Sequence, residues 1–377
     1  MKVLLTGGGT AGHINPALAI ADMIRRNAPG SEIAFVGIRG GKEEDLVPRE
    51  GYRLYYVKSK GIQRSCRPRA MLSNVHALWL AAASPYYKST RSILDDFQPD
   101  IVIGTGGYAC WPIMAAAARR GIPTALHESN ALPGLAVRKL QGKVDRIWTN
   151  FDRTAELLRV RETVRRVGNP LRGGFGGISR SAAREQLGLR DGERLVLCFG
   201  GSLGAEHLNR AVLDLMRQLA PGMPEVRFCL ASGKRDFADC RKVFEASGLD
   251  RAANCTLTDY IYDMPTQMAA AELVVSRAGA MTLSELARMG VPSVLVPSPY
   301  VADNHQYLNA KTFADAGAAV LVEERELADG RLCEAVGALL REPGRTAEMG
   351  RAAKPFADVD ADRLIWEDIL RLTGQNA

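Results

Sequence analysis

The chain has 377 residues, of which 49 are Lys or Arg and 42 are Asp or Glu, giving a net charge of +7. Hydrophobic residues make up 46% and charged residues 24%, which excludes a disordered or collagen-like chain, and the length predicts two domains. Seven scattered cysteines without a C-x-x-C spacing predict free thiols in a reducing, cytosolic compartment. The N-terminal apolar run is too short for a signal peptide, and no apolar run predicts a transmembrane helix.

Short apolar runs alternate with stretches at helical spacing along almost the whole chain. Such runs are typical of buried parallel strands, and Ala17, Leu18, Ala21 and Ile24 have the helical spacing that follows the first of them. The alternation predicts βαβ units and therefore an α/β fold with parallel sheets. The predicted strands are Val3–Thr6, Ile33–Val36, Ile101–Gly104, Thr124–His127, Arg146–Thr149, Leu195–Phe199, Phe228–Ala231, Leu273–Ser276, Val294–Val296 and Ala319–Val322.

The two halves open alike, because residues 2–24 and 194–216 each contain a strand, a glycine-rich turn and an amphipathic helix. This repeat predicts two Rossmann-like doubly wound domains, 1–168 and 169–356, with ligands in the cleft between them at the carboxyl ends of the strands. The Gly- and Pro-rich segment Val167–Gly177 is the predicted joint. A final helix is predicted within 357–377 and can pack on either domain, including back on the first.

Three glycine-rich loops follow predicted strands. They are Gly7–His13, Gly104–Tyr108 and Gly200–Ala205. Glycine lets backbone amides approach a phosphate, and the helix that follows adds a partial positive charge. A plain strand-to-helix turn also favours glycine, but three such loops in two halves favour phosphate binding.

The first loop also fits the dinucleotide fingerprint G-x-G-x-x-G, at Gly7, Gly9 and Gly12. That fingerprint needs an acidic residue at the end of the second strand for the ribose. Arg39 stands there instead, and the next acid is Glu43. A nicotinamide oxidoreductase therefore stays a weak alternative, with a 2′-phosphate cofactor the conceivable form.

Polar clusters follow three further strands, where a ligand cleft would lie. They are His127–Asn130, Ser276–Glu285 and Asp303–Gln306. Each has a structural alternative: Thr282 and Glu285 have the spacing of a capping box, Asp303 suits a helix N-cap, and His127 suits a satisfied, partly buried histidine. His13 is different, because the positive end of a helix disfavours imidazolium and leaves a neutral ring able to accept a proton.

Seven segments in order carry a resemblance to a known family. They are GGGTAGHINPALA, GTGGYACWP, HESNALPG, VGNPLR, GGSLGA, SRAGAMTLSE and DNHQYLNA. The chain resembles the MurG family of peptidoglycan glycosyltransferases, in glycosyltransferase family 28, with Ser129 where some members have Gln. The resemblance implies a GT-B fold and transfer of N-acetylglucosamine from UDP-N-acetylglucosamine, with inversion, to the 4-hydroxyl of lipid-linked N-acetylmuramoyl-pentapeptide. Another UDP-sugar enzyme on the same scaffold, such as a 2-epimerase, or a sugar-nucleotide sensor without chemistry, remains an alternative.

The resemblance also implies roles for individual residues. The donor would contact Thr10, Ala11, Gly12, Asn130, Arg172, Ser202, Ile261, Ala280, Met281, Thr282, Leu283, Ser284, Glu285 and Gln306. Ser202 would bind the donor diphosphate, with Arg172 near it. Ile261 would contact the uracil through its backbone, and Glu285 would bind the ribose hydroxyls. Gln306 and Asn130 would bind the sugar hydroxyls or acetamido group.

The first two glycine-rich loops would then face the acceptor diphosphate, through Gly8, Gly9, Gly106, Gly107 and Tyr108. His13 is the candidate general base, and its rival role is a hydrogen bond to that diphosphate. No Asp-x-Asp stands at a strand end, so we expect no metal ion and no other cofactor.

The segment 58–91 holds seven basic residues and no acidic one, interleaved with apolar residues. A solvated loop before a core helix would give this pattern, and a basic patch can also bind nucleic acid, although the chain has no recognised nucleic-acid module. With a lipid-linked acceptor implied, we favour peripheral binding to an anionic membrane at the cytoplasmic face. The residues expected to make it are Arg64, Arg67, Arg69, Leu72, Trp79 and Leu80.

Overall fold

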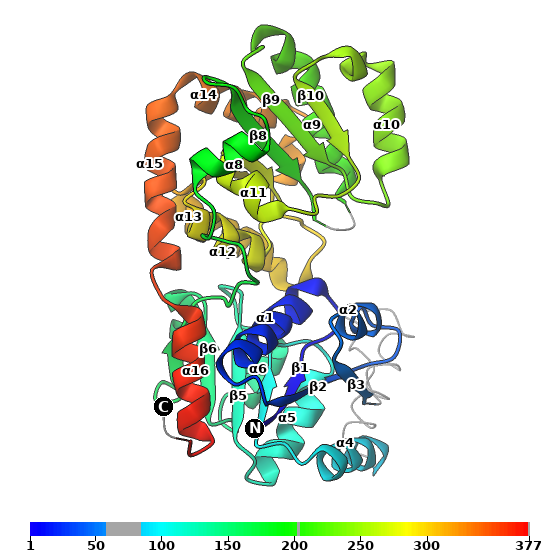
Figure 1. Ribbon diagram of the computed structural model, residues 1–377, viewed down its shortest axis with the longest axis vertical. Coiled ribbons are helices and arrows are strands. Elements are labelled where there is room, and N and C mark those ends of the chain that lie inside the picture. The colour runs from blue at the N-terminus through cyan, green and yellow to red at the C-terminus, as the bar shows by residue number, and fades with distance from the viewer. Residues whose placement is uncertain (58–83, 202–203, 376–377) are drawn as a thin grey trace. The chain divides into compact units, whose positions relative to one another are not determined.

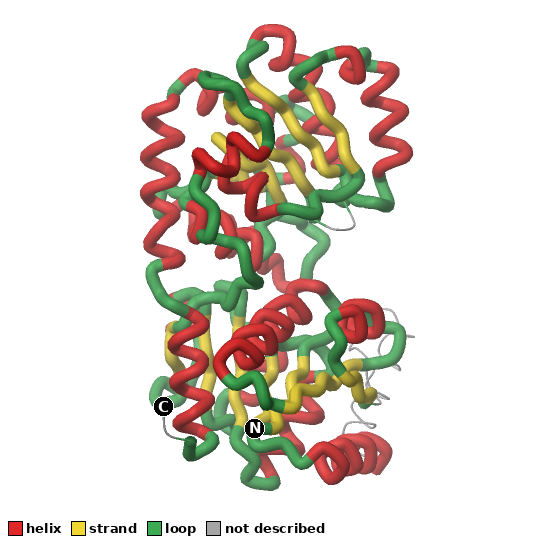
Figure 2. Tube along the Cα trace, viewed as in Figure 1, coloured by secondary structure: helices red, strands yellow, loops and turns green. Residues whose placement is uncertain are grey.

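The structure is a computed structural model that describes residues 1–57, 84–201 and 204–375. The chain divides into two compact units, Met1–Arg172 with Val359–Ala377, and Gly173–Asp358. In each unit, helices cover both faces of a sheet (Figures 1 and 2). The division follows residue 172 instead of 168, and the last helix belongs to the N-terminal unit. Within the described residues, no helix is both long and apolar enough to cross a membrane.

The N-terminal unit contains a parallel seven-stranded sheet in the order β3-β2-β1-β4-β5-β6-β7. Its strands are β1 (Lys2–Thr6), β2 (Glu32–Gly37), β3 (Arg53–Tyr56), β4 (Ile101–Gly104), β5 (Thr124–Glu128), β6 (Arg146–Thr149) and β7 (Val164–Arg166). Its described helices are α1 (Ala11–Asn27), α2 (Glu43–Arg49), α4 (Ser84–Phe97), α5 (Cys110–Arg119), α6 (Leu135–Leu140), α7 (Asp152–Glu156) and α16 (Ala361–Leu372).

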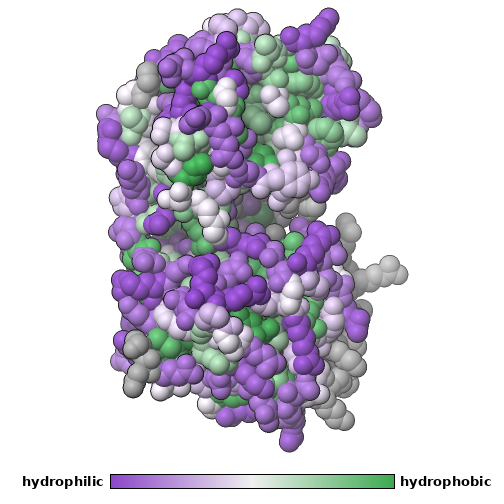
Figure 3. Space-filling model, in the orientation of Figure 1, coloured by the Kyte–Doolittle hydropathy of each residue, from purple (hydrophilic) through white to green (hydrophobic). Residues whose placement is uncertain are grey.

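Alternate side chains of these strands enter two separate cores. Val3 and Leu5 of β1 pack with α1 and α16 on one face, whereas Leu4 packs with α4, α5 and α6 on the other. All three are fully buried, as expected for a strand covered on both faces. On the side shown in Figure 3, the outer surface is largely hydrophilic and its hydrophobic residues lie in separate patches.

Helix α16 is held on the N-terminal unit by a buried carboxylate. Asp368 accepts a hydrogen bond of 2.9 Å from the Trp148 indole and one of 2.9 Å from Arg165, and it lies 3.4 Å from Arg146 Nε. Since two guanidinium groups and an N–H donor surround Asp368, its charge is compensated despite full burial.

The C-terminal unit contains a parallel six-stranded sheet in the order β10-β9-β8-β11-β12-β13. Its strands are β8 (Arg194–Phe199), β9 (Val226–Ala231), β10 (Cys255–Thr258), β11 (Ala271–Ser276), β12 (Ser293–Leu295) and β13 (Ala319–Leu321). Its α-helices are α8 (Arg180–Gln186), α9 (Glu206–Leu219), α10 (Phe237–Ala246), α11 (Met264–Ala270), α12 (Ala280–Met289), α13 (His305–Asp315), α14 (Arg331–Arg341) and α15 (Pro343–Ala353). Short 3-10 turns are Ala220–Gly222, Leu249–Arg251, Ala302–Asn304, Glu324–Glu326 and Lys354–Ala357.

Both sheets reverse their strand order at the first strand of the unit, as in doubly wound folds. In the N-terminal unit β1 pairs with β4, and Thr6 lies opposite Gly104 at the ends of the two strands. In the C-terminal unit β8 pairs with β11, and Phe199 lies opposite Ser276. The glycine-rich loops therefore begin at the two switch points, where open α/β sheets bind ligands.

The predicted α/β class is confirmed, and all ten predicted strands are present with ends that differ by two residues at most. The prediction missed β3, β7 and β10. Each of these strands lies at an edge of its sheet and is only partly buried. An edge strand covered incompletely does not need a continuous apolar run, which was the signal used.

Candidate active site

The two glycine-rich loops of the N-terminal unit contact each other beyond the ends of β1 and β4. The Gly8 amide donates to the Gly106 carbonyl at 3.4 Å, and the Thr105 hydroxyl donates to the His13 carbonyl at 2.6 Å. A Cβ added to Gly107 would lie 2.1 Å from the Gly8 carbonyl oxygen. Glycine is thus required here by the close contact of two backbones.

His13 lies in the first turn of α1, and its ring is fixed against the second loop. Its Nδ1 is 3.0 Å from the Thr105 carbonyl oxygen, and a Cβ at Gly106 would lie 2.6 Å from the same nitrogen. Because a carbonyl oxygen only accepts, Nδ1 carries the hydrogen and Nε2 keeps its lone pair. Burial lowers the pKa of His13 below its ordinary 6.5. The ring is therefore neutral near pH 7 and able to accept a proton through Nε2.

The amides of the first loop are not equally available to a ligand. The Gly8 amide is bonded to Gly106, and the Gly9 amide donates to Glu43 Oε2 at 3.0 Å. The expectation that Gly8 and Gly9 bind the acceptor diphosphate is therefore not supported for their amides. The first turn of α1 instead leaves the amides of residues 10–12 without a carbonyl partner in the helix, and Thr10 does not use its side chain as a cap.

The second loop is partly committed in the same way. The Gly106 carbonyl accepts the Gly8 amide, and the Thr105 carbonyl accepts from the His13 ring. Gly107 has a positive φ of 84°, and the Tyr108 side chain is 49% exposed. Gly107 and Tyr108 are thus the positions of this loop best able to contact an acceptor.

A buried carboxylate orients Asn130 at the end of β5. Glu128 accepts hydrogen bonds from the Asn130 amide at 3.0 Å, from the Asn130 side chain at 3.2 Å and from the Gly134 amide at 2.7 Å. His127 is fully buried, donates from Nε2 to the Gly168 carbonyl at 2.9 Å, and has its pKa lowered by burial to about 4. His127 therefore matches the structural alternative, except that it is fully and not partly buried.

Arg172 is bound within the N-terminal unit. Its guanidinium makes two hydrogen bonds to Glu50, of 2.9 and 2.7 Å, and lies 3.3 Å from Asp22. These carboxylates, Glu50 first, raise the pKa of Arg172. A diphosphate would have to compete with Glu50 for this group, so the observed contacts do not support the expected role of Arg172.

In the C-terminal unit, a glycine-rich loop joins β8 to α9. Gly201 and Gly204 have positive φ angles of 96° and 84°, and a Cβ at Gly204 would lie 2.2 Å from the Ser232 carbonyl oxygen. The loop therefore depends on glycine at both positions. The predicted diphosphate ligand Ser202 lies outside the described residues.

Helix α12 begins at Ala280 with Gly279 as its N-cap, which excludes the capping box expected as an alternative for Thr282 and Glu285. Glu285 is instead in the second turn. Burial raises the pKa of Glu285 from its ordinary 4.5 to about 7. No described residue bonds to its carboxyl group, so both oxygens remain able to bind hydroxyls.

The other predicted residues of α12 divide into two groups. Leu283 is fully buried, and the Ser284 hydroxyl donates to the Ala280 carbonyl at 3.2 Å. Ala280, Leu283 and Ser284 are all buried, so their side chains belong to the packed interior. Side-chain contacts from these residues to the donor are therefore not supported. Met281 and Thr282 are partly exposed and stay candidates.

Gln306 is oriented by the backbone at the start of α13. Its side-chain carbonyl accepts a hydrogen bond of 2.9 Å from the Ser298 amide, which leaves its NH₂ group able to donate. The helix begins at His305, so the predicted N-cap role of Asp303 is wrong. Asp303 and Asn304 instead have φ angles of 53° and 49°, a conformation that is uncommon outside glycine and that clusters at functional sites.

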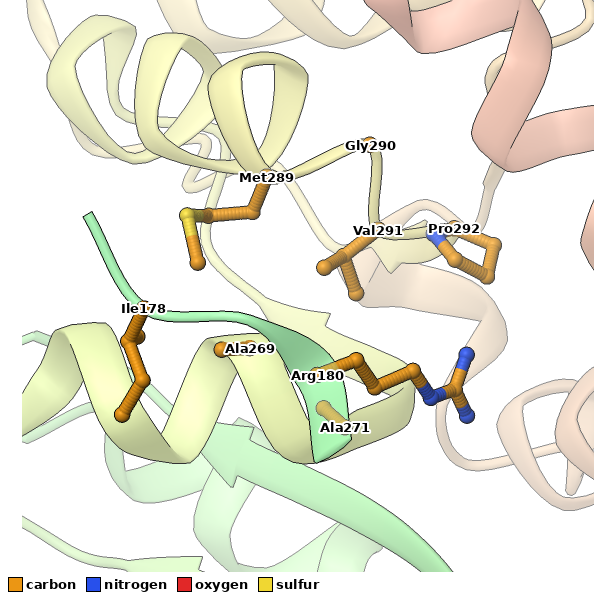
Figure 4. Close-up of a pocket in the computed structure, with 8 residues that line it drawn as sticks. All are labelled: Ile178, Arg180, Ala269, Ala271, Met289, Gly290, Val291 and Pro292. Carbon is orange, nitrogen blue, oxygen red and sulfur yellow. The ribbon is translucent and has the colours of Figure 1, made fainter. Parts of the chain in front are cut away.

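The remaining predicted residues are Ile261 and the membrane set. Ile261 is 9% exposed and lies between the exposed rings of Tyr260 and Tyr262. Because its side chain is buried, only its backbone can contact a uracil ring. The six predicted membrane residues lie outside the described residues. A hollow formed by Ile178, Arg180 and the ends of α11 and α12 contains none of the predicted site residues (Figure 4).

Two doubly wound parallel sheets with glycine-rich loops at their switch points are the architecture of the GT-B glycosyltransferases, a class that includes the solved structure most like this chain in sequence among those compared below. The chain belongs to glycosyltransferase family 28. The N-terminal domain of that family matches residues 3–149, and its C-terminal domain matches residues 195–364.

Relatives carry the full description UDP-N-acetylglucosamine--N-acetylmuramyl-(pentapeptide) pyrophosphoryl-undecaprenol N-acetylglucosamine transferase. The protein of Acetivibrio thermocellus is 39% identical over 98% of this chain and 97% of its own length. The protein of Desulforudis audaxviator is 36% identical over 100% of this chain and 99% of its own length. The crystal structure of Acinetobacter baumannii MurG matches with a TM-score of 0.74 and 26% identity, over 98% of this chain and 99% of that one. The structure of UDP-GlcNAc 2-epimerase from Neisseria meningitidis matches with a TM-score of 0.63 and 15% identity, over 98% of this chain and 100% of that one. At this identity the likeness shows the fold alone.

Proposed function

We propose that this chain transfers N-acetylglucosamine from UDP-N-acetylglucosamine to the 4-hydroxyl of a lipid-linked N-acetylmuramoyl-pentapeptide, with inversion, in peptidoglycan synthesis. The relatives' description supplies the two substrates. The observation that carries the chemistry is His13, a neutral imidazole whose Nδ1 is tied to the Thr105 carbonyl and whose Nε2 keeps its lone pair.

In this proposal the donor is bound by the C-terminal unit. The β8–α9 loop and the start of α12 serve the UDP moiety, Glu285 accepts from the ribose hydroxyls, and the Gln306 NH₂ group donates to the sugar. The N-terminal unit binds the acceptor and supplies His13, which takes the proton of the attacking hydroxyl. The oxygen then bonds to the anomeric carbon while UDP departs with the electrons of the broken bond, its charge stabilised by backbone amides.

The direct test measures UDP release from UDP-N-acetylglucosamine, in EDTA, with and without a short-chain lipid-linked acceptor. Acceptor-dependent release with a new disaccharide-lipid is the expected result, and it would also establish that no metal is needed. Release without acceptor would favour hydrolysis or an epimerase-like reaction. Tight UDP binding without any release would mean that the acceptor was misidentified.

We also propose peripheral attachment to the cytoplasmic face of a membrane, since a pyrophosphoryl-undecaprenol acceptor is confined to a bilayer. Changing Arg64, Arg67 and Arg69 to Glu should weaken binding to anionic vesicles, by roughly 1 kcal/mol for each basic residue lost near the surface. Vesicle flotation at low and high salt measures this. Unchanged binding of the triple variant would remove the proposal.

A further inference from the structure

A buried glutamate ties the first glycine-rich loop to a neighbouring loop. Glu43 is 1% exposed, its Oε2 accepts the Gly9 amide at 3.0 Å, and its Oε1 accepts the Ile38 amide at 2.9 Å. No Lys, Arg or His of the described residues forms an ion pair with it. A carboxylate buried without a counter-ion is costly unless it is hydrogen-bonded, so these two amides are what satisfies it.

Three glycines make room for this carboxylate. A Cβ at Gly8 would lie 2.5 Å from a Glu43 side-chain atom, and one at Gly37 or Gly41 would lie 2.4 Å away. These glycines come from three places: the first glycine-rich loop, the end of β2 and the turn before α2. The whole neighbourhood is therefore shaped around one side chain.

The contact decides how the first loop enters α1. Gly9 has a positive φ of 85°, and its amide points at Glu43. The next residue, Thr10, is the N-cap of α1, and its carbonyl accepts the His13 amide at 3.0 Å. Fixing Gly9 therefore fixes where α1 begins and the position from which the His13 side chain projects. It also removes one amide from the ligand and leaves those of residues 10–12.

We propose that Glu43 is a positioning residue for the acceptor half of the reaction, which holds the first loop in the one conformation that presents His13 and the amides of residues 10–12. The proposal rests on the proposed function. Glu43 touches neither substrate, and it acts through Gly9 and His13.

The test compares Glu43→Gln with Glu44→Gln. Glu44 is the matched control, because it is on the same helix and also accepts a backbone amide, that of Gly40 at 2.9 Å. Glu43→Gln loses a charge-assisted bond to the loop, so kcat/KM for the acceptor should fall about ten- to a hundredfold. UDP affinity should stay within about twofold, because the C-terminal unit binds the UDP moiety, and Glu44→Gln should leave both values near those of the wild type.

A double-mutant cycle with His13→Ala separates positioning from general stability. If Glu43 acts through His13, Glu43→Gln should cost little more once His13 is gone. Equal losses in both backgrounds, or a wild-type acceptor kcat/KM in Glu43→Gln, would overturn the proposal.

If Glu43→Gln does not fold, Gly41→Ala displaces the same carboxylate without touching the first loop and should give the same loss of acceptor kcat/KM with UDP affinity unchanged. A normal acceptor kcat/KM in folded Gly41→Ala would then overturn the proposal. Failure of the proposed function is distinguishable, since the wild-type protein would then transfer no sugar to the acceptor.

Discussion

The two units share a strand order but organise their ligand loops differently. In the N-terminal unit, two glycine-rich loops hydrogen-bond each other and fix a neutral histidine between them. In the C-terminal unit, the second turn of α12 carries Glu285, whose carboxyl group bonds to no described residue, and the Gln306 NH₂ group has no hydrogen-bond partner among the described residues. In the first half, hydrogen bonds within the unit fix the reacting group, and the amides of residues 10–12 are what it leaves for a ligand. The other half keeps open hydrogen-bonding groups, which suits recognition of a ligand rich in hydroxyls.

The largest effect should come from His13. Changing it to Ala should lower kcat by about 10²- to 10⁴-fold, the usual contribution of a general base, while UDP affinity stays unchanged. Steady-state kinetics and UDP titration measure the two values. Parallel loss of UDP binding would break the comparison between a reacting half and a recognising half.

The same histidine predicts a pH dependence. Burial lowers the pKa of His13 below 6.5, so the ring stays neutral until the pH falls to this lowered pKa. We therefore expect kcat/KM to fall only when the pH drops below that pKa. A pH–rate profile with an acidic limb above 7 would exclude His13 as the base.

Asp368 tests whether the N-terminal unit depends on α16. Removing this carboxylate leaves Arg165 and Arg146 without their buried partner, so Asp368→Ala should lower the free energy of unfolding by about 3–5 kcal/mol. Asp362→Asn, on the same helix and paired with Arg26 at the surface, should cost under about 1 kcal/mol. Chemical denaturation compares the two variants, and equal losses would mean that the buried network is not what holds α16.

Changing Glu285 should have a smaller effect, with opposite directions for the two quantities measured: stability should rise and UDP affinity should fall. The folded protein holds its proton up to a pKa of about 7, against 4.5 ordinarily, so stability falls as the pH rises between these values. Glu285→Gln should therefore stabilise the ligand-free protein at pH 8 by about 1–3 kcal/mol and have little effect at pH 4. UDP affinity should weaken about tenfold. Loss of both stability and affinity at pH 8 would contradict an open, binding carboxyl group.

The sequence predicted the elements whose signal is local, such as the glycine-rich loops and the central strands. Edge strands β3, β7 and β10 escaped because their partly exposed residues need no apolar run. The role of Glu43 could not be predicted, since it depends on glycines brought together from three segments. The capping-box alternative for Glu285 failed for a related reason: the backbone at Gly279, and not the Thr–Glu spacing, sets the start of α12.

The return of α16 to the N-terminal unit has a consequence for folding during synthesis. Residues 1–172 emerge from the ribosome first, yet the core around Trp148 is completed only by Leu364, Ile365 and Ile369. Until those residues emerge, an apolar face and the guanidinium of Arg165 stay uncovered. The C-terminal unit, contiguous in the chain, can close before the N-terminal unit does, so the part of the protein translated first is the last to be finished.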